Sequence, residues 1–138
     1  MKTKIMDLMR QKNYRPSDSF TLAKMLGNPE TKVLLRALEE LENEGEIVRD
    51  QLGKYALASR MGFVKGTIDL KATGYGFLEV EGREADIYIP ATKTHGAFGG
   101  DTCLVRVINY RSSDRIEGEV VKILKRKLDE VLSLNLPI

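Results

Sequence analysis

Apolar residues recur with two different periods along the chain, one in each half. In the first half they return every three or four positions, as Leu34, Leu38 and Leu41 do, which is the spacing of one helix face. After about residue 62 they alternate with polar residues, which is the period of a half-buried strand. The pattern therefore predicts an α+β chain, with helices first and strands afterwards.

Breaker residues divide the first half into three helices. We expect the first helix over about residues 4–10 and the second over residues 20–27, where a glycine ends it. Residues 14–18 break the first helix and offer a cap for the second. Asn28 is expected to be the N-cap of the third helix and Pro29 its first residue, because that position does not need the N–H that proline lacks.

A short hairpin follows the third helix, which Gly45 ends. Residues 46–49 and 54–57 are its expected strands, joined by a turn at residues 50–53. Three helices followed by a two-stranded hairpin is the element order of a winged helix-turn-helix. We assign this domain to residues 1–58.

The second half contains five strand-like runs separated by glycine-rich or charged turns. The runs are Phe63–Leu70, Gly76–Val80, Asp86–Ile89, Thr102–Asn109 and Glu117–Leu124. Five short strands in this length predict a small barrel of the OB type, over residues 62–127. Residues 128–138 are then a C-terminal tail that would lead into a further domain.

Two neighbouring strands place aromatic and aliphatic side chains on opposite faces. Because strand side chains alternate with period two, Tyr75, Phe77 and Tyr88 share one face. The opposite face carries Leu78, Val80, Ile87 and Ile89. If the aliphatic face is the core, the three rings are exposed and suited to stacking on unpaired bases. Packing under a loop or against the helical half is the alternative for these rings, and core or interdomain packing is expected for Phe63 and Phe98.

Composition narrows the class of protein without identifying its function. A hydrophobic content of 42% and a charged content of 30% are those of a globular protein rather than a disordered chain. No apolar run approaches a membrane span and no secretory segment is visible, so we expect a cytoplasmic location. A net charge of +2 is a weak argument for nucleic-acid binding. One histidine and one cysteine cannot make a usual zinc site, and Cys103 is expected to be a small buried side chain.

Two motifs in the second half resemble the RNA-binding motifs of cold-shock domains. They are Gly74-Tyr75-Gly76-Phe77 and Asp86-Ile87-Tyr88-Ile89-Pro90. Residues 66–68 precede the first motif, and residues 96–101 and 117–126 follow the second. This order behind a winged helix resembles the N-terminal region of the ribonuclease R group in the ribonuclease II/R family. The aromatic set is smaller than in free-standing cold-shock domains, so the resemblance implies modest affinity for single strands.

The resemblance implies that the parent protein is a processive 3′→5′ exoribonuclease, with a downstream catalytic domain that holds Mg²⁺ through clustered aspartates. A two-metal reaction needs several converging carboxylates, and no closely spaced set of aspartates here matches that pattern. We therefore expect this chain to have no nuclease activity alone and to hold no cofactor. Its expected partners are single-stranded or structured RNA and other domains of the same enzyme. Neither a membrane nor a small-molecule substrate is expected.

Basic residues near the motifs are candidates for phosphate contacts, namely Lys71, Lys65, Arg83 and Lys93. His95 is a candidate for stacking or for donating a hydrogen bond. Lys71 is favoured because it enters the loop before the first motif, and a solvated surface residue with no role is the alternative for each. Candidates for helix-turn-helix contacts are Lys32, Arg36, Arg49 and Lys54. These residues keep two further hypotheses open. One is a regulator that binds duplex DNA through the third helix, and the other is a scaffold that docks proteins through the winged helix.

Overall fold

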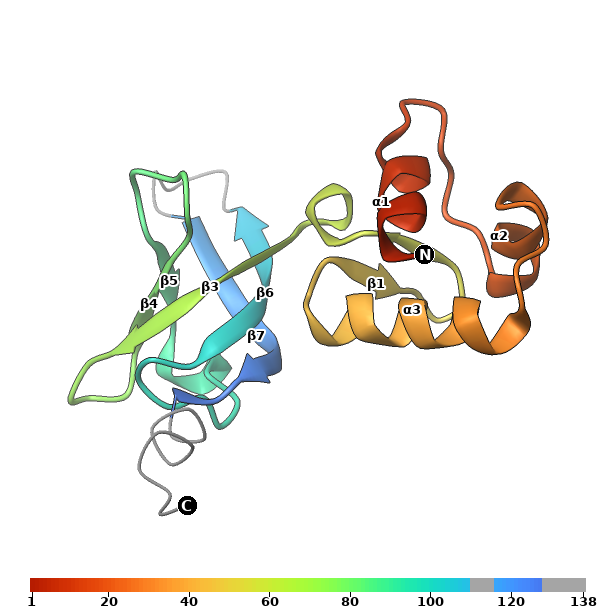
Figure 1. Ribbon diagram of the computed structural model, residues 1–138. Helices are drawn as coiled ribbons and strands as arrows, with labels where there is room; N and C mark the ends of the chain where they lie inside the picture. The colour runs from red at the N-terminus through yellow and green to blue at the C-terminus, as the bar shows by residue number, and fades with distance from the viewer. Residues whose placement is uncertain (110–115, 128–138) are drawn as a thin grey trace, which may run out of the picture. The chain divides into compact units, whose positions relative to one another are not determined.

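The computed structural model describes residues 1–109 and 116–127, and the chain divides into two compact units, Met1–Met61 and Gly62–Ile138 (Figure 1). Each unit has its own hydrophobic core. The expected C-terminal tail at residues 128–138 lies outside the described residues. Within the described part of the chain, no helix combines the length and the apolar character that crossing a bilayer requires.

The first unit contains three helices and a two-stranded antiparallel hairpin, as the sequence predicts. Its elements are α1 (Lys2–Arg10), α2 (Ser19–Met25), α3 (Thr31–Asn43), β1 (Ile47–Arg49) and β2 (Tyr55–Leu57). Helix α3 packs against α1, α2 and β1. Its inward face is the expected stripe, in which Leu34, Leu38 and Leu41 are each at most 2% exposed. Ile5 and Met9 of α1 and Leu22 of α2 complete this core from the other helices.

The start of α3 differs from the prediction. The helix begins at Thr31 with Glu30 at the N-cap, so the assignment of Asn28 as the cap and Pro29 as the first residue was wrong. Asn28 is instead used to end α2, because its N–H donates to the carbonyl of Ala23 at 2.7 Å and its φ is 55°. This backbone geometry closes the preceding helix and is incompatible with a helical N-cap, which is extended.

Side-chain hydrogen bonds stabilise the start of α2, the hairpin turn and the end of α1. The Asp18 carboxylate accepts a hydrogen bond from the N–H of Thr21 at 2.8 Å and caps α2 as expected. In the hairpin turn, the Asp50 carboxylate accepts from the N–H groups of Leu52 and Lys54, both at 2.9 Å. Arg60 donates to backbone carbonyls at the end of α1, including that of Met9 at 2.8 Å. It thereby supplies hydrogen-bond donors to carbonyls that have no partner within the helix.

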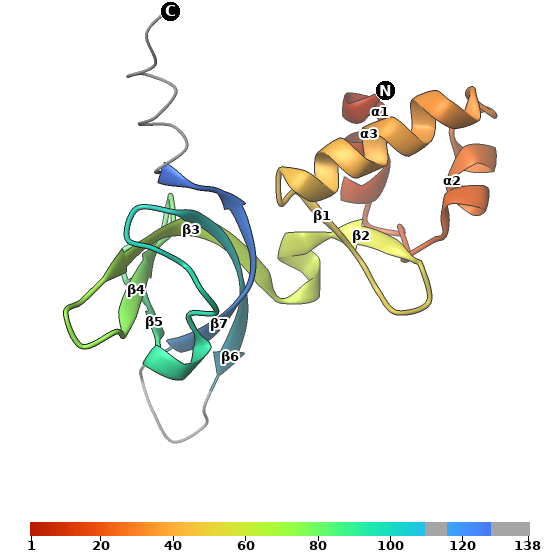
Figure 2. The same ribbon diagram turned by 90° about the horizontal axis from the view of Figure 1, so that it is seen from below.

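The second unit is a closed five-stranded barrel, as the sequence predicts (Figure 2). Its strands are β3 (Phe63–Leu70), β4 (Gly76–Glu79), β5 (Ile87–Ile89), β6 (Thr102–Asn109) and β7 (Ile116–Lys125). They are joined in the order β3-β4-β5-β7-β6, and pairing of β6 with β3 closes the barrel. The β5–β7 contact is parallel and the other pairs are antiparallel.

The barrel interior is aliphatic, and one buried acid, Asp101, lies directly before β6. Cys103 is fully buried, and desolvation raises the pKa of its thiol to about 11, so it acts as a small apolar side chain as expected. Asp101 is 1% exposed and accepts hydrogen bonds from the N–H groups of Phe98 and Lys127 and from the guanidinium of Arg126. These bonds tie the segment before β6 to the end of β7.

The substitution Gly66→Ala is expected to destabilise the barrel. A Cβ at this position in β3 would lie 2.4 Å from the backbone oxygen of Glu79 on β4 and 2.9 Å from Cγ of Leu78. Overpacking of this kind costs typically about 1–3 kcal/mol, and a backbone neighbour cannot turn aside as a side chain can. The midpoint of urea denaturation measures the loss.

Gly99→Ala is the matched control, because the nearest atom to its Cβ would be the Leu70 nitrogen at 3.9 Å. This variant is expected to denature at the wild-type midpoint. Equal midpoints for Gly66→Ala and wild type would show that β3 and β4 are not packed as closely as described.

Candidate nucleic-acid interface

Three aromatic rings form a contiguous group on the outside of the barrel. Phe77 lies on β4, and Tyr75 is the residue directly before that strand. Tyr88 lies directly opposite Phe77 on β5. The ring centroids are 5.8 Å apart for Tyr75–Phe77, 5.9 Å for Tyr75–Tyr88 and 5.8 Å for Phe77–Tyr88. We refer to these three residues as the aromatic patch.

Strand alternation places the aromatic patch outside. Leu78, Ile87 and Ile89 are fully buried in the barrel, so the alternate residues Phe77 and Tyr88 point outward. All three rings are half-buried because they pack on one another at interplanar angles of 83°, 43° and 59°. The prediction that aromatic and aliphatic residues fall on opposite faces is therefore confirmed. Mutual packing also restricts the rings, so that a flat ligand meets a group that is already arranged.

Two glycines of the first motif serve the backbone. Gly74 has a φ of 99° and ends a turn in which its N–H donates to the carbonyl of Lys71 at 2.9 Å. At Gly76, a Cβ would lie 2.9 Å from the backbone oxygen of Asp69 on β3. The two glycines thus permit the tight turn before β4 and the close approach of β4 to β3.

Carboxylates flank the aromatic patch on both sides. Asp69 of β3 lies opposite Phe77, and Glu117 of β7 lies opposite Tyr88. Lys71 forms an ion pair with Asp69 at 3.0 Å, and this hydrogen bond raises the pKa of Lys71. The patch therefore suits an uncharged base better than a phosphate, and the charge of Lys71 is locally balanced by Asp69.

The structure separates the other predicted barrel residues from one another. Lys65 is exposed on β3 opposite Leu104 of β6, and Arg83 is exposed in the turn between β4 and β5. His95 follows the 3-10 turn after β5 and contacts Glu119 of β7, with 2.7 Å between Nε2 and Oε2. Among the predicted barrel residues, Lys71 lies nearest to the aromatic patch in the sequence. Its backbone N–H also donates to the carbonyl of Tyr75 at 2.8 Å.

Two features of this surface were missed or misassigned from the sequence. Arg106 of β6 donates to Glu119 at 2.6 Å, and the only local signal for it was an outward position in an alternating strand. Phe98, for which core or interdomain packing was expected, is 61% exposed. It is stacked instead with the guanidinium of Arg126, whose carbon lies 4.9 Å from the ring centroid.

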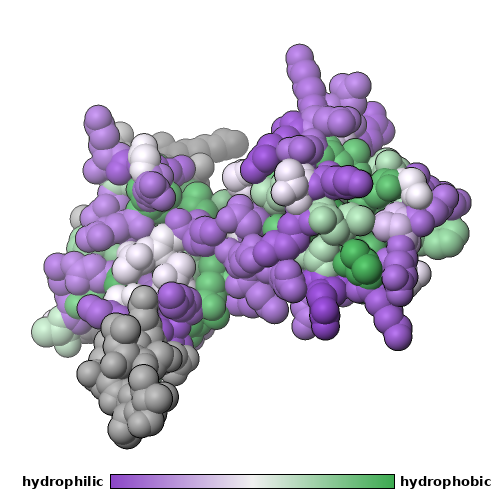
Figure 3. All heavy atoms as spheres, viewed as in Figure 1, coloured by the Kyte–Doolittle hydropathy of each residue, from purple (hydrophilic) through white to green (hydrophobic). Residues whose placement is uncertain are grey.

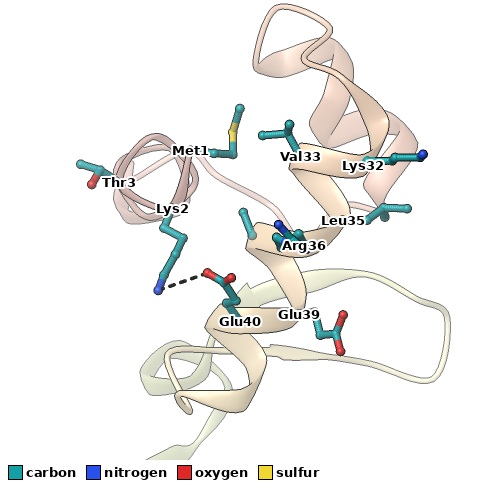
Figure 4. Close-up of a pocket in the computed structure, with 10 residues that line it drawn as sticks. Met1, Lys2, Thr3, Lys32, Val33, Leu35, Arg36, Glu39 and Glu40 are labelled. Atoms are coloured by element: carbon teal, nitrogen blue, oxygen red, sulfur yellow. Dashed lines mark ion pairs between the residues drawn. The ribbon is translucent and has the colours of Figure 1, made fainter.

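The helix-turn-helix candidates lie on a surface of mixed charge. Lys32 and Arg36 line an open groove of about 820 Å³ between the start of α1 and α3. Figure 4 shows Glu40 on the same wall, pointing toward Lys2, with which it forms an ion pair at 3.6 Å. Val33 is also part of this groove and is 45% exposed. The groove is therefore neither continuously basic nor polar throughout.

The hairpin candidates differ in their surroundings. Arg49 lies 3.9 Å from the carboxylate of Glu42 and 5.7 Å from the centroid of the Tyr55 ring. Lys54 is exposed beside the hairpin turn, and its N–H donates to Asp50. On the face seen in Figure 3, hydrophilic side chains predominate in each unit and apolar residues show between them. Within residues 1–109 and 116–127, no group of three or more potential metal ligands could hold an ion.

Residues 66–123 match the model of a protein family described as the ribonuclease B OB domain. This range begins within β3 and ends within β7, so it takes in all five strands of the barrel. The first unit lies outside the match.

Curated relatives cover more of the chain. It is 35% identical over 101 residues to ribonuclease R of Acidithiobacillus ferrooxidans, an alignment that covers 73% of this chain and 23% of the relative. It is 32% identical over 106 residues to ribonuclease R of Escherichia coli, an alignment that covers 77% of this chain and 13% of the relative. It is 32% identical over 124 residues to ribonuclease R of Aquifex aeolicus, with 88% of this chain and 17% of the relative covered. The chain thus spans less than a quarter of the length of these relatives. They confirm the predicted resemblance to ribonuclease R.

Solved structures overlap with about half of the chain. The apo form of Mycoplasma genitalium RNase R gives a TM-score of 0.43 at 23% identity, covering 46% of this chain and 10% of that chain. A structure of yeast Ssd1, described as a pseudonuclease, gives a TM-score of 0.42 at 18% identity, covering 49% and 14%.

Acidification is expected to reveal the contacts of Glu119. The hydrogen bond to His95, followed by that to Arg106, lowers the pKa of Glu119 below its ordinary value of 4.5. A lowered pKa in the folded state stabilises the fold above pH 4.5, and this contribution disappears as the pH falls through the folded value. Glu119→Gln should therefore lose less stability than wild type when the pH drops below 4.5, as measured by the thermal midpoint.

Glu81→Gln, at an exposed carboxylate in the β4–β5 turn, serves as the control and should follow the wild-type curve. Parallel acid profiles for wild type and Glu119→Gln would contradict the contacts described.

Proposed function

We propose that this chain is an accessory RNA-binding segment of a ribonuclease R-like 3′→5′ exoribonuclease, because residues 66–123 match the family model of the ribonuclease B OB domain. It captures or guides single-stranded RNA for a catalytic domain that this chain does not contain. The observation that carries the proposal is the aromatic patch, in which three rings contact one another on the outside of a barrel. A ribonuclease R from Mycoplasma genitalium is itself described in complex with ribose-methylated single-stranded RNA.

Stacking explains why this surface suits RNA despite the acidic residues near it. A base is uncharged and presents a flat π-face, so it can lie on a ring whose neighbours are Asp69 and Glu117. Each stacked base contributes roughly 1–3 kcal/mol, whatever its sequence. Three rings therefore support binding of modest strength and little sequence preference.

In this proposal the chain binds RNA without cleaving it. Two-metal hydrolysis requires several carboxylates that converge on the ions. The described residues offer no cluster of three such ligands, so we assign hydrolysis and its Mg²⁺ to another part of the parent enzyme. The parent is then expected in the cytoplasm, with its other domains as partners of this segment.

Protein docking through the winged helix is the second candidate function. Val33 and Leu35 are 45% and 46% exposed on α3, beside Lys32 and Arg36. Exposed apolar residues on this helix favour a protein partner over the phosphates of duplex DNA, and Glu39 and Glu40 in the same groove oppose phosphates directly. A DNA-binding regulator is therefore the weakest of the three hypotheses.

Replacement of any ring in the aromatic patch is expected to weaken binding of a single-stranded oligonucleotide. Tyr75→Ala, Phe77→Ala and Tyr88→Ala should each raise Kd by roughly 5- to 150-fold, which corresponds to the loss of one stacked base at about 1–3 kcal/mol. Fluorescence anisotropy of a labelled oligoribonucleotide measures the affinity, and circular dichroism confirms that each variant is folded.

Phe20→Ala removes another exposed ring, 69% exposed on α2, and should leave Kd unchanged. Lys32→Ala and Arg36→Ala should also bind single strands as wild type does, whereas a DNA regulator would lose duplex binding in these two variants. Unchanged affinity in all three variants of the aromatic patch would remove the basis for the proposed function.

A further inference from the structure

A charged cluster lies on the outside of the barrel beside the aromatic patch. Glu119 of β7 receives a hydrogen bond from Nη2 of Arg106 on one oxygen, at 2.6 Å. Its other oxygen lies 2.7 Å from Nε2 of His95. One carboxylate therefore holds two nitrogen donors that come from β6 and from the loop after β5.

Strand pairing places this cluster next to the aromatic patch. Tyr88 lies opposite Glu117, and Glu119 points to the same outer face because the intervening Gly118 is buried. Arg106 lies opposite Glu119 on the next strand, β6. Neighbouring strands are about 4.8 Å apart, so β6 lies roughly 10 Å across the sheet from β5. A short stretch of single strand can span this distance.

The two nitrogen-bearing side chains of this cluster are exposed enough to contact a ligand. Glu119 is 24% exposed, whereas the side chains of Arg106 and His95 are 54% and 51% exposed. A guanidinium carries five N–H donors in a planar fork, so the bond to Glu119 leaves others able to reach an oxyanion. The carboxylate is thus covered by the groups that it holds, and those groups face the solvent.

The backbone at His95 adds a second observation. His95 has a φ of 45°, in the left-handed region that a residue with a side chain adopts only at a cost. The next residue, Gly96, is also left-handed, and its carbonyl accepts a hydrogen bond from Arg126 at 3.1 Å. This held loop follows β5 and brings the imidazole to the carboxylate of Glu119 on β7.

We propose that Arg106 and His95 form a phosphate-binding edge of the aromatic patch, with Glu119 as the positioning residue that aims both. The backbone phosphates of a single RNA strand contact this edge while the bases of the same strand stack on the patch. The inference rests on the proposed RNA-binding function and names the phosphate contacts of that site. It adds Arg106 and Glu119 to the residues that the sequence suggested.

Two substitutions with opposite expected effects test the proposal. Arg106→Gln removes one phosphate contact, so Kd for a single-stranded oligoribonucleotide rises severalfold at low salt and the slope of log K against log salt becomes shallower by about 0.7. Glu119→Gln keeps an oxygen that can accept from Arg106 but removes the negative charge, so Kd falls severalfold at low salt. If the ion pair between Arg106 and Glu119 had a purely structural role, the two substitutions would not change Kd in opposite directions. Arg106→Lys keeps the charge and should retain most of the wild-type slope.

Arg10→Gln is the matched control, since Arg10 is likewise an exposed arginine in an ion pair, with Asp7 at 3.5 Å in the first unit. Its affinity and salt slope should equal those of wild type. The proposal is overturned if Arg106→Gln keeps the wild-type slope, or if Glu119→Gln and Arg106→Gln change the affinity in the same direction. If the proposal is overturned but replacement of Phe77 still weakens binding, the proposed RNA-binding function stands. If neither the variants of the aromatic patch nor those of Arg106 and Glu119 change the affinity, both the RNA-binding function and the phosphate-binding edge are contradicted.

Discussion

Closure of the barrel is the constraint on which the rest of this molecule depends. When β6 pairs with β3, every strand acquires one inward and one outward face. Aliphatic residues such as Ile87 and Ile89 must then fill the interior, and the residue between them, Tyr88, must point outside. The same alternation acts on β4, so that Phe77 meets Tyr88 across the pair. The aromatic patch is thus a consequence of how the core is filled.

The alternation of apolar and polar residues was sufficient to predict the strands and the strand face on which the aromatic rings lie. The expected bounds of β3 and β6 agree with the structure, because alternation of apolar and polar residues is a property of neighbouring positions. The helical stripe of α3 was predictable for the same reason, through its period of three to four residues. The start of α3 was not, because Asn28 has features of both an N-cap and a helix end, and the conformation of the preceding glycine turn decided between them.

Contacts that depend on strand register lay beyond the sequence. Arg106 and Glu119 are distant in the chain and become neighbours only through the pairing of β6 with β7, which contains two register shifts. Exposure of Phe98 could not be read from its apolar character, since its partner is an arginine at the end of β7. In each case a single long-range pairing settled the role of a side chain.

The central claim is that bases stack on the aromatic patch, and NMR of the ring protons tests it most directly. Titration of the protein with a single-stranded oligoribonucleotide should shift the resonances of Tyr75, Phe77 and Tyr88 upfield in step with binding, because a stacked base shields the ring beneath it. The exposed ring of Phe20 should keep its position. Saturable binding that leaves all three resonances unmoved would contradict the account, since the RNA would then lie elsewhere on the protein.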